Sequence, residues 1–410
     1  MDLKKIKYIA SKTLRKNLDD LTALASGGYP GFVYRKLTLP GADQIPVFTF
    51  HRLEPVSFEA QLKHLAQNHY KTLSGDEFLS CLTGVKRLPP KAVLLTFDDC
   101  WGSLWAVAHP LLKKYGLQGV AFAISDAMEQ GDGVGATLED VWAGTRSMDE
   151  ILGREVKAPL CNWAEIKRMS RAGTLEFQSH SRMHHSVYID SEVVDFVNPD
   201  RYPSFMFSDF NPLINLGANE VAEWDLDARC YGEPIYPFRA SFAARRRFIP
   251  NHQVSAACRA YVTERGGKHF FQSADWRKEL MRVYTNIAEQ ESEKGTIVSY
   301  HQRLEELVQD LTMSKRIIEQ NLENKVDQIC LPWYQGDAIA VEAAKLADYR
   351  ACHWGILNNT TVNTVGDDPF YVRRMNDEYL FALPGEGRQS LLQILAKKYL
   401  NIVKKRTGMY

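Results

Sequence analysis

The fold is decided by one stretch of sequence, Ala92-Val93-Leu94-Leu95-Thr96-Phe97-Asp98-Asp99. Its apolar and β-branched run is too short for a free-standing helix and is typical of a buried parallel strand. In parallel α/β proteins the functional groups gather at the carboxyl ends of strands, and this strand ends on Asp98 and Asp99. Two adjacent carboxylates repel each other when both are ionised and unpaired. The pair therefore predicts a bound cation or a raised pKa on one of the two groups.

A second group of polar residues follows another short apolar run, residues 175–179. This run leads directly into His180, and His184 lies one helical turn further along the chain. One carboxylate and two imidazoles form a donor set that suits zinc or a similar divalent ion. The two motifs together predict a metal site at the end of a parallel sheet.

Composition sets the broad class of protein. The chain has 410 residues, enough for two or three domains, and its 45% hydrophobic content is that of an ordinary globular protein rather than a disordered one. Charged residues make up 24% and balance to a net charge of zero. Nucleic acid is therefore not an expected partner.

The same features bear on location. No stretch has the length of a transmembrane helix, the N-terminus lacks a signal-peptide core, and the seven cysteines are scattered without CxxC spacing. We therefore expect a cytoplasmic protein with reduced thiols. The basic amphipathic ends could touch a membrane surface, although a solvated N-terminal face and a C-terminal helix docked on the barrel are the favoured alternatives. The sequence does not indicate an oligomeric state.

Strand-like and helix-like segments alternate along the chain. Strands are predicted at 45–51, 92–99, 119–124, 175–179, 296–301, 326–331 and 349–353. Helices are predicted at 57–68, 101–115, 304–322 and 338–346, with further helices after capping residues Ser74 and Asn162 and a loop at 129–161. This alternation predicts a parallel α/β fold, either a barrel or a doubly wound sheet.

Three motifs, in this order, resemble the polysaccharide deacetylase family (NodB homology, carbohydrate esterase family 4). They are Thr96–Asp99, His180–His184 and, in part, Pro332–Tyr334. Residues 45–51 and 58–65 are also similar to the bacterial exopolysaccharide-type members. The resemblance covers residues 45–190 and 296–385.

The resemblance implies a distorted (β/α)7-type barrel with an inserted subdomain. We accordingly expect an N-terminal extension at 1–44, two barrel parts at 45–190 and 296–385, an insertion at 191–295, and a C-terminal amphipathic helix at 386–410. Many prolines break the strand–helix rhythm within the insertion. Because it follows the His180 loop, we expect it to form one wall of the substrate cleft.

The resemblance also implies metal-dependent removal of N-acetyl groups from amino sugars in a polysaccharide, oligosaccharide or glycoconjugate precursor. By position in the motifs, Asp98 would be the catalytic base, and Asp99, His180 and His184 would bind one divalent ion. Zinc is the expected metal, with cobalt, nickel and manganese as alternatives. The backbone N–H of Tyr334 would help to hold the oxyanion.

Neighbouring residues are weaker candidates. Ser181 could orient the metal ligands, Trp333 could stack on a sugar ring, and His51 could line the pocket, although a packed core histidine is an equally good interpretation of His51. His185 competes with His184 as a ligand, but only His184 has the motif spacing. Cys100 stands where the family commonly has glycine.

Two elements of the family pattern are missing. The arginine of the third motif, which orients the catalytic aspartate, is replaced by Leu331 or Cys330, and Arg373 or Arg374 could take its place. The late Leu-x-His motif that supplies a general acid is not evident, which leaves His353, His301 or a metal-bound water. Two other functions therefore stay open, namely hydrolysis of another non-peptide C–N bond and a catalytically inactive sugar-binding or scaffolding protein.

Overall fold

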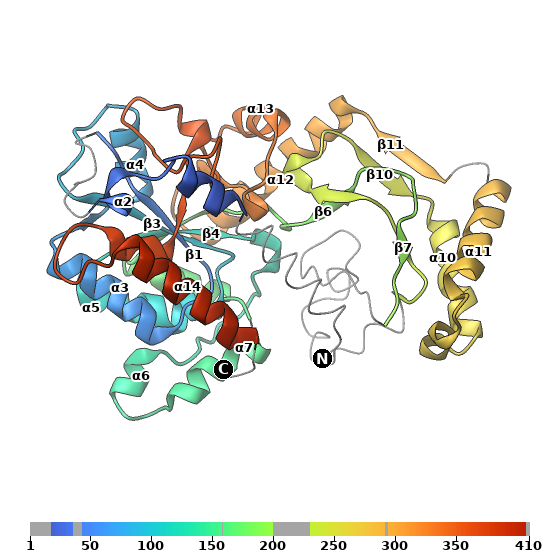
Figure 1. The fold of residues 1–410 in the computed structure, drawn as a ribbon, viewed down its shortest axis with the longest axis horizontal. Coiled ribbons are helices and arrows are strands. Elements are labelled where there is room, and N and C mark those ends of the chain that lie inside the picture. The colour runs from blue at the N-terminus through green and yellow to red at the C-terminus, as the bar shows by residue number, and fades with distance from the viewer. Residues whose placement is uncertain (1–17, 36–42, 158, 200–229, 292–293, 407–410) are drawn as a thin grey trace. The chain divides into compact units, whose positions relative to one another are not determined.

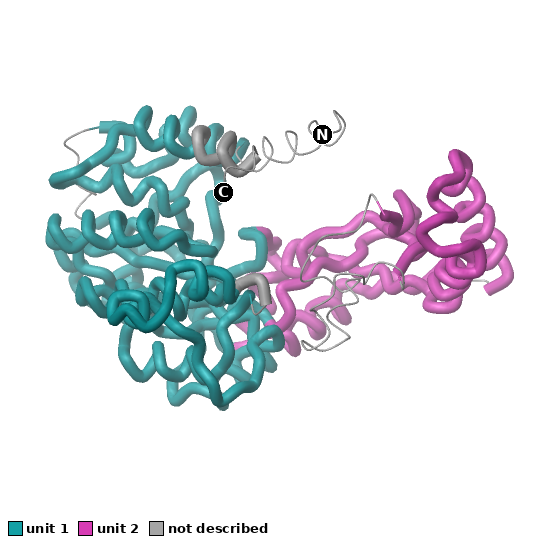
Figure 2. The backbone as a smooth tube through the Cα atoms, turned by 90° about the horizontal axis from the view of Figure 1, so that it is seen from below, with its two compact units in different colours: residues 1–181, 313–334, 348–410 teal, residues 182–312, 335–347 magenta. Residues whose placement is uncertain are grey.

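The computed structural model describes residues 18–35, 43–157, 159–199, 230–291 and 294–406. The chain divides into two compact units (Figure 2). Unit 1 comprises residues 1–181, 313–334 and 348–410, and unit 2 comprises residues 182–312 and 335–347. No helix in the described ranges combines the length and the apolar character that crossing a membrane requires.

The strands of unit 1 form one parallel sheet in the order β13-β12-β5-β4-β3-β1-β14, with β2 paired to β3 (Figure 1). The sheet curls into a half-barrel and confirms the predicted distorted barrel. Its strands are β1 (Val47–Phe50), β2 (Lys71–Thr72), β3 (Ala92–Asp98), β4 (Gly119–Ala123), β5 (Leu175–Ser179), β12 (Gln328–Cys330), β13 (Ala351–His353) and β14 (Met375–Asn376).

Strand β3 is an interior strand of this sheet. All seven residues of β3 are buried, and β3 pairs in parallel with both β1 and β4. A core of buried apolar side chains from these strands and from helix α4 packs around it; it includes Val47, Phe78, Leu82, Leu94, Val120, Phe122, Cys330, Ala351 and Val372. A strand that is buried on both faces has a continuous apolar sequence. This is why the sequence of β3 predicted a buried parallel strand.

The segment 372–376 brings the two edges of the half-barrel together. Val372 forms a parallel bridge with His353 of β13, while Met375 and Asn376 form β14 beside β1. The backbone N–H of Trp354 donates to Val372, and that of Val372 donates to Cys352. Residues late in the chain are thereby inserted beside the first strand.

Helices surround the sheet of unit 1. They are α2 (Gly31–Tyr34), α3 (Pro55–Gln67), α4 (Gly75–Leu82), a π-helical turn η1 (Leu104–Ala108) continued by α5 (His109–Tyr115), η2 (Ser125–Ala127), α6 (Leu138–Trp142), α7 (Met148–Lys157), α8 (Trp163–Arg171), η7 (Pro332–Tyr334), η8 (Pro369–Tyr371), η9 (Asp377–Ala382) and α14 (Leu391–Arg406). The predicted capping boxes of α4 and α8 are both present, at Ser74 with Glu77 and at Asn162 with Glu165.

The prediction of a loop at 129–161 was wrong, because this segment contains helices α6 and α7. Each begins with a reciprocal cap, Thr137 with Asp140 and Ser147 with Glu150. Both caps follow the S/T-x-x-D/E pattern, so a sequence signal existed. Weak apolar periodicity concealed it.

The C-terminal helix α14 packs onto unit 1 through a buried cluster of polar groups. Lys398 Nζ donates to Asp20 Oδ2 at 2.8 Å, and the hydroxyls of Tyr29 and Tyr379 also donate to the Asp20 carboxylate. Ile394, one turn earlier on α14, is buried. This side of the helix is therefore in contact with the barrel, as the docking alternative predicted.

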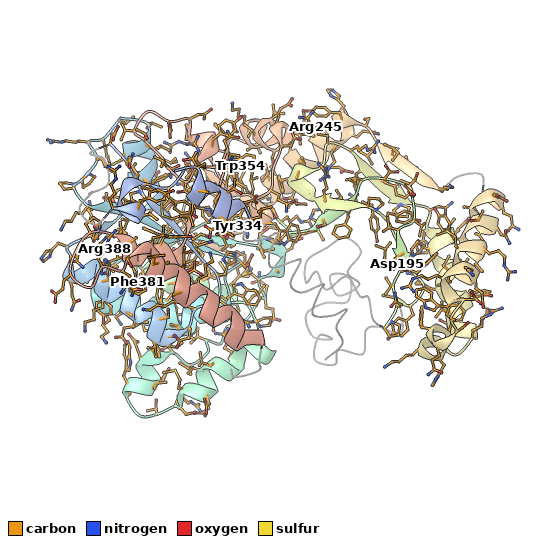
Figure 3. All side chains as sticks on the ribbon, in the orientation of Figure 1. Asp195, Arg245, Tyr334, Trp354, Phe381 and Arg388 are labelled. Carbon is orange, nitrogen blue, oxygen red and sulfur yellow. The ribbon has the colours of Figure 1, made fainter. Side chains whose placement is uncertain are left out.

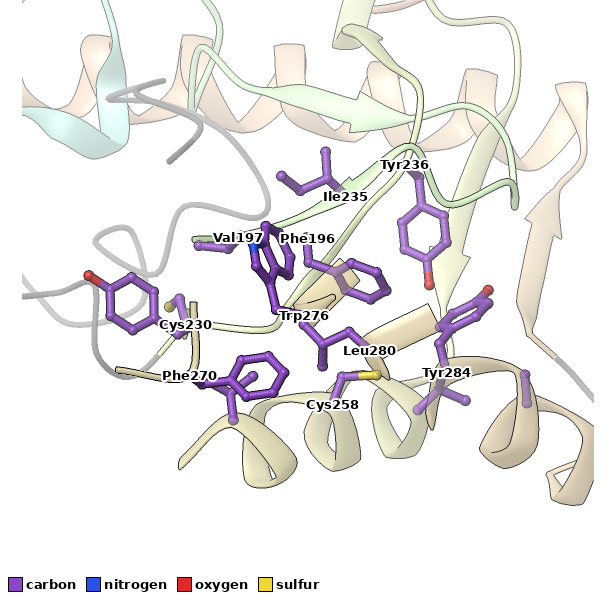
Figure 4. Close-up of a cluster of buried hydrophobic side chains, with 14 of the residues drawn as sticks. Phe196, Val197, Cys230, Ile235, Tyr236, Cys258, Phe270, Trp276, Leu280 and Tyr284 are labelled. Atoms are coloured by element: carbon purple, nitrogen blue, oxygen red, sulfur yellow. The ribbon is translucent and has the colours of Figure 1, made fainter. Parts of the chain in front are cut away.

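Unit 2 has its own core of aromatic and aliphatic side chains, which include Phe196, Tyr236, Trp276 and Leu280 (Figure 4). Its elements are β6 (Ser186–Tyr188), β7 (Asp195–Phe196), β8 (Pro234–Ile235), β9 (Phe238–Ala240), η5 (Ser241–Ala243), β10 (Arg247–Pro250), α10 (His252–Glu264), η6 (Gly267–Gln272), α11 (Trp276–Gln290), β11 (Gly295–Val298) and α13 (Ala338–Leu346); α12 (Tyr300–Asn321) begins here and ends in unit 1. The expected insertion, 191–295, lies within the segment 182–312.

The strand predicted at 296–301 does not belong to the barrel. It is β11, and it pairs antiparallel with β10 in a separate two-stranded ribbon within unit 2. The three consecutive arginines at 245–247 are ion-paired in unit 2. Arg245, labelled in Figure 3, binds Asp337 with two hydrogen bonds of 2.7 and 2.9 Å.

Candidate active site

The candidate site begins where β3 ends. Asp98 is the last residue of β3, and its carboxylate is 1% exposed. Asp99 and Cys100 follow with positive φ angles of 70° and 57°, in the left-handed region that non-glycine residues seldom adopt. The chain therefore turns sharply after Asp98, and the two carboxylates take different environments.

Asp98 is held by a buried arginine. Arg374 Nη1 donates to Asp98 Oδ1 at 2.7 Å, and Arg374 Nη2 donates to Asp98 Oδ2 at 2.9 Å. The other N–H groups of Arg374 donate to Trp354 O, Thr96 Oγ1 and Cys330 Sγ at 2.8, 3.2 and 2.9 Å. All five donors of this fully buried guanidinium therefore have acceptors, which is the condition under which a buried charge is tolerated.

This environment sets the charge of Asp98. Burial alone would raise the pKa of its carboxyl group, but Arg374, together with His180 and His51, lowers the pKa to about 2. Asp98 is therefore ionised at neutral pH, with both oxygens fixed in direction. Of the two arginines that the sequence offered, Arg374 makes this contact, whereas Arg373 pairs with Asp367 at 3.1 Å.

The second carboxylate faces the histidines. Asp99 Oδ1 lies 3.3 Å from His180 Nε2, while His180 Nδ1 lies 2.8 Å from the backbone oxygen of Cys330. A ring that donates from Nδ1 to a carbonyl presents its Nε2 lone pair to the site. This is the tautomer that a metal-binding imidazole needs.

Donor atoms of Asp99, His180 and His184 all lie within 4.8 Å of one another, and all three residues are buried. His184 follows His180 by four positions in the chain. One carboxylate oxygen and two imidazole nitrogens match the chemistry of divalent zinc. The donor set thus fits the metal that the sequence predicted.

His51 and Tyr334 lie on the open side of Asp98. His51 Nε2 is 3.9 Å from Asp98 Oδ2, and the His51 side chain is 45% exposed. The Tyr334 hydroxyl is 3.4 Å from the same His51 nitrogen, and burial and Asp98 raise the pKa of Tyr334, so this hydroxyl keeps its proton. A Cβ added to Gly355 would lie 2.9 Å from Tyr334 Cβ and Cγ, so only glycine leaves room for this ring.

The backbone of Tyr334 differs from expectation. Its N–H donates to Leu331 O at 3.0 Å inside the turn η7, so it is already engaged and is not offered to an oxyanion. The turn has this form because Trp333 and Tyr334 both take positive φ angles, of 53° and 61°. In this arrangement Tyr334 faces the site with its hydroxyl group.

Cys330 contacts both members of the Asp98–Arg374 pair. Its sulfur accepts from Arg374, its S–H donates to Asp98 Oδ2 at 3.6 Å, and its carbonyl accepts from His180. Burial raises the pKa of the Cys330 thiol, so it stays protonated and can donate.

Other candidates lie away from the reacting groups. Ser181 is fully buried, and its N–H donates to Ser179 Oγ at 3.2 Å, so it shapes the loop and is not placed to contact a substrate. His301 is exposed on α12 in unit 2. His185 is buried, burial and nearby arginines lower its pKa to about 3, and it is not part of the donor group. Trp333 is half-buried, whereas Trp105, Trp163 and Trp354 are buried in unit 1.

His353 is part of the core instead of the site. It is fully buried on β13, and its Nε2 lies 2.9 Å from Gln328 Oε1. Burial, with a smaller effect of Arg374, lowers the pKa of His353 to about 3. The ring is therefore neutral at physiological pH and is not positioned as a general acid.

Comparison with known proteins agrees with the motifs. A family model described as polysaccharide deacetylase matches residues 85–201. This segment contains Asp98, Asp99, His180 and His184, whereas His51, Tyr334 and Arg374 lie outside it.

Three relatives share part of the sequence. YxkH of Bacillus subtilis, a protein named for the same family, is 34% identical over 93 residues, which are 21% of this chain and 33% of that protein. The poly-beta-1,6-N-acetyl-D-glucosamine N-deacetylase of Escherichia coli is 25% identical over 154 residues, or 38% of this chain and 20% of the enzyme. The enzyme of the same name from Staphylococcus aureus is 26% identical over 130 residues, or 32% of this chain and 37% of the enzyme. The chain thus spans about a third of these relatives or less.

The Asp98–Arg374 pair can be tested by stability. We expect Arg374→Met to lower the free energy of unfolding by about 3–5 kcal/mol, because it leaves the Asp98 carboxylate buried without its counter-charge. Arg373→Met is the matched control, since Arg373 pairs with a partly exposed Asp367 and such pairs contribute about 1 kcal/mol or less. Urea unfolding followed by tryptophan fluorescence measures both, and equal losses in the two variants would contradict the assignment.

The neutral His353 predicts a pH-dependent stability. The unfolded chain binds a proton at this residue below about pH 6.5, whereas the folded chain binds it only below about pH 3. The free energy of unfolding should therefore fall as the pH drops through this window, by up to about 1.4 kcal/mol per pH unit from this group. His353→Gln should flatten that slope in urea titrations at pH 4–7, and an unchanged slope would exclude a buried neutral imidazole.

Proposed function

Because a family model described as polysaccharide deacetylase matches residues 85–201, we propose that this chain is a metal-dependent hydrolase that removes the N-acetyl group from an amino sugar. The substrate is a polysaccharide, an oligosaccharide or a glycoconjugate precursor, as the names of the Escherichia coli and Staphylococcus aureus relatives suggest. One observation carries the proposal. Two adjacent carboxylates have separate partners, a guanidinium for Asp98 and two imidazoles for Asp99.

Asp99, His180 and His184 are the residues that would hold the metal, and we propose zinc because the donors are one oxygen and two nitrogens. A bound divalent ion polarises the acetyl carbonyl and acidifies a bound water. The Cys330 carbonyl orients His180 for this role through its contact with Nδ1.

Asp98 is the proposed general base. Arg374 keeps its carboxylate ionised and fixes both oxygens, so the group is ready to accept a proton without reorganising. The low pKa that results makes Asp98 a weak base whose carboxylate is held in a fixed orientation. The contact with Arg374 thus lowers the basicity of the Asp98 carboxylate and fixes the direction of its oxygens.

His51 is the proposed proton donor to the departing amine. It lies on the exposed side of Asp98, 3.9 Å from its Oδ2, and the Tyr334 hydroxyl is 3.4 Å from the same ring nitrogen. We assign Tyr334 the role of orienting His51 with its hydroxyl and its ring. Trp333 precedes Tyr334 in the sequence and is half-buried. We propose that its ring stacks on the sugar.

A catalytically inactive sugar-binding protein is the competing class. It was suggested by the missing third-motif arginine and the missing late histidine. Arg374 pairs with Asp98 at 2.7 Å and His51 lies 3.9 Å from it, which supports an enzyme instead. Hydrolysis of another non-peptide C–N bond uses the same groups, and a panel of amide substrates distinguishes it.

Separate variants test the base and the metal ligands. Asp98→Asn should lower the rate of acetate release from N-acetylglucosamine oligomers by about 10²- to 10⁴-fold, because the amide cannot accept the proton, while the bound metal is retained. His184→Ala should lose both metal and activity. Its control is His185→Ala, which removes an adjacent buried imidazole outside the donor group and should keep stoichiometric metal.

Elemental analysis of the purified variants and an acetate assay provide the measurements. Asp98→Asn with wild-type turnover would overturn the role of the base. Stoichiometric metal in His184→Ala would overturn the ligand set. The expectation that residues 191–295 form one wall of the substrate cleft stays a prediction, tested by the chain-length preference of a variant lacking that segment.

A further inference from the structure

The two oxygens of the Asp99 carboxylate have different partners. Oδ1 lies 3.3 Å from His180 Nε2 and so faces the donor group, whereas Oδ2 accepts a hydrogen bond of 3.1 Å from the indole Nε1 of Trp101. We propose that Trp101 is a positioning residue that restricts Asp99 to binding the metal through one oxygen. This inference rests on the metal site of the proposed function.

The backbone around Trp101 is held in place by a second segment of unit 1. Trp101 forms an antiparallel bridge with Leu160. On one side the Cys161 N–H donates to the oxygen of the residue before Trp101 at 2.8 Å, and on the other the Gly102 N–H donates to Pro159 O at 2.7 Å. Cys161 Sγ also donates to the Trp101 carbonyl at 3.2 Å. The indole thus projects from a fixed backbone.

The indole ring is restricted as well. The guanidinium carbon of Arg52 lies 4.6 Å from the ring centroid, a cation–π contact on one face of the half-buried indole. Arg52 directly follows His51 in the sequence and is exposed. The fixed backbone and the contact with Arg52 together hold the Trp101 Nε1–H in the direction of Asp99.

Asp99 needs such a partner because of its own backbone. Its φ of 70° places it in a sharp turn, where the side-chain direction is not fixed by a regular strand. A carboxylate with both oxygens available can bind a cation through either one or both of them. With Oδ2 engaged by an N–H donor, only Oδ1 is presented, and more coordination positions stay open for water and for the acetyl oxygen.

The test compares two tryptophans whose indole N–H groups donate to different acceptors. Trp101→Phe removes the donor to Asp99 and keeps an aromatic ring. Trp105→Phe is the matched control, because the Trp105 indole donates to Gly135 O at 2.6 Å instead of to the site. Each full-length variant is stripped of metal and titrated with Zn²⁺ against a chelator of known affinity, and the Co²⁺ form is examined by visible absorption.

We expect Trp101→Phe to weaken Zn²⁺ binding by about 10- to 100-fold and to change the Co²⁺ absorption spectrum. Without the indole N–H on Oδ2, either oxygen of Asp99 can bind the metal. Trp105→Phe should leave both unchanged. Thermal unfolding of the metal-free proteins shows that the variants are folded, and Trp101→Met provides the same loss of the N–H if the Phe variant does not fold.

The outcomes separate this inference from the proposed function. If the wild-type chain and Trp101→Phe bind Zn²⁺ equally and have the same Co²⁺ spectrum, the role of Trp101 is overturned and the metal site stays intact. A wild-type chain that binds no Zn²⁺ would overturn the metal site and this inference with it.

Discussion

The ion pair between Asp98 and Arg374 is the constraint on which the rest of unit 1 depends. Burying two charges is unfavourable unless each is paired and hydrogen-bonded, and here both carboxylate oxygens and all five guanidinium donors have partners. Those partners come from β3, β12 and the segments on either side of η8. The pair therefore links β3 to both edges of the half-barrel, and the same contacts that complete the fold also orient the proposed base.

Backbone strain is concentrated around this pair. Several non-glycine residues on three loops take positive φ angles, and within the described residues they include Asp99, Cys100, Ser181, His184, Trp333 and Tyr334. Such conformations are unfavourable and persist only where the surrounding structure enforces them. The parallel strands that precede these loops are buried and hydrogen-bonded on both sides, so they can hold the turns. Rigid strands and strained loops together place side chains that a relaxed turn would direct elsewhere.

How far the sequence could predict this structure depends on the range of each interaction. β3, the capping box at Ser74 and the His180–His184 spacing are local patterns, and each has one physical interpretation in a parallel α/β chain. Arg374 is 276 positions from Asp98, and nothing local distinguishes it from Arg373, so only the fold could decide between them. The strand predicted at 296–301 was expected in the barrel but is β11 of a separate ribbon, because a short β-branched sequence is equally typical of both. The engagement of the Tyr334 N–H depends on two left-handed residues that no side-chain pattern foretells.

The closing segment 372–376 has a consequence for how the protein is made. A ribosome delivers Asp98 276 positions before its guanidinium partner, so while the residues between them are made the nascent barrel has an exposed edge and a carboxylate that must remain hydrated. Contacts between residues so distant in sequence also make folding slow. The barrel can therefore mature only after its last strand has emerged, and a chain cut short by premature termination would lack both a sealed core and an oriented base.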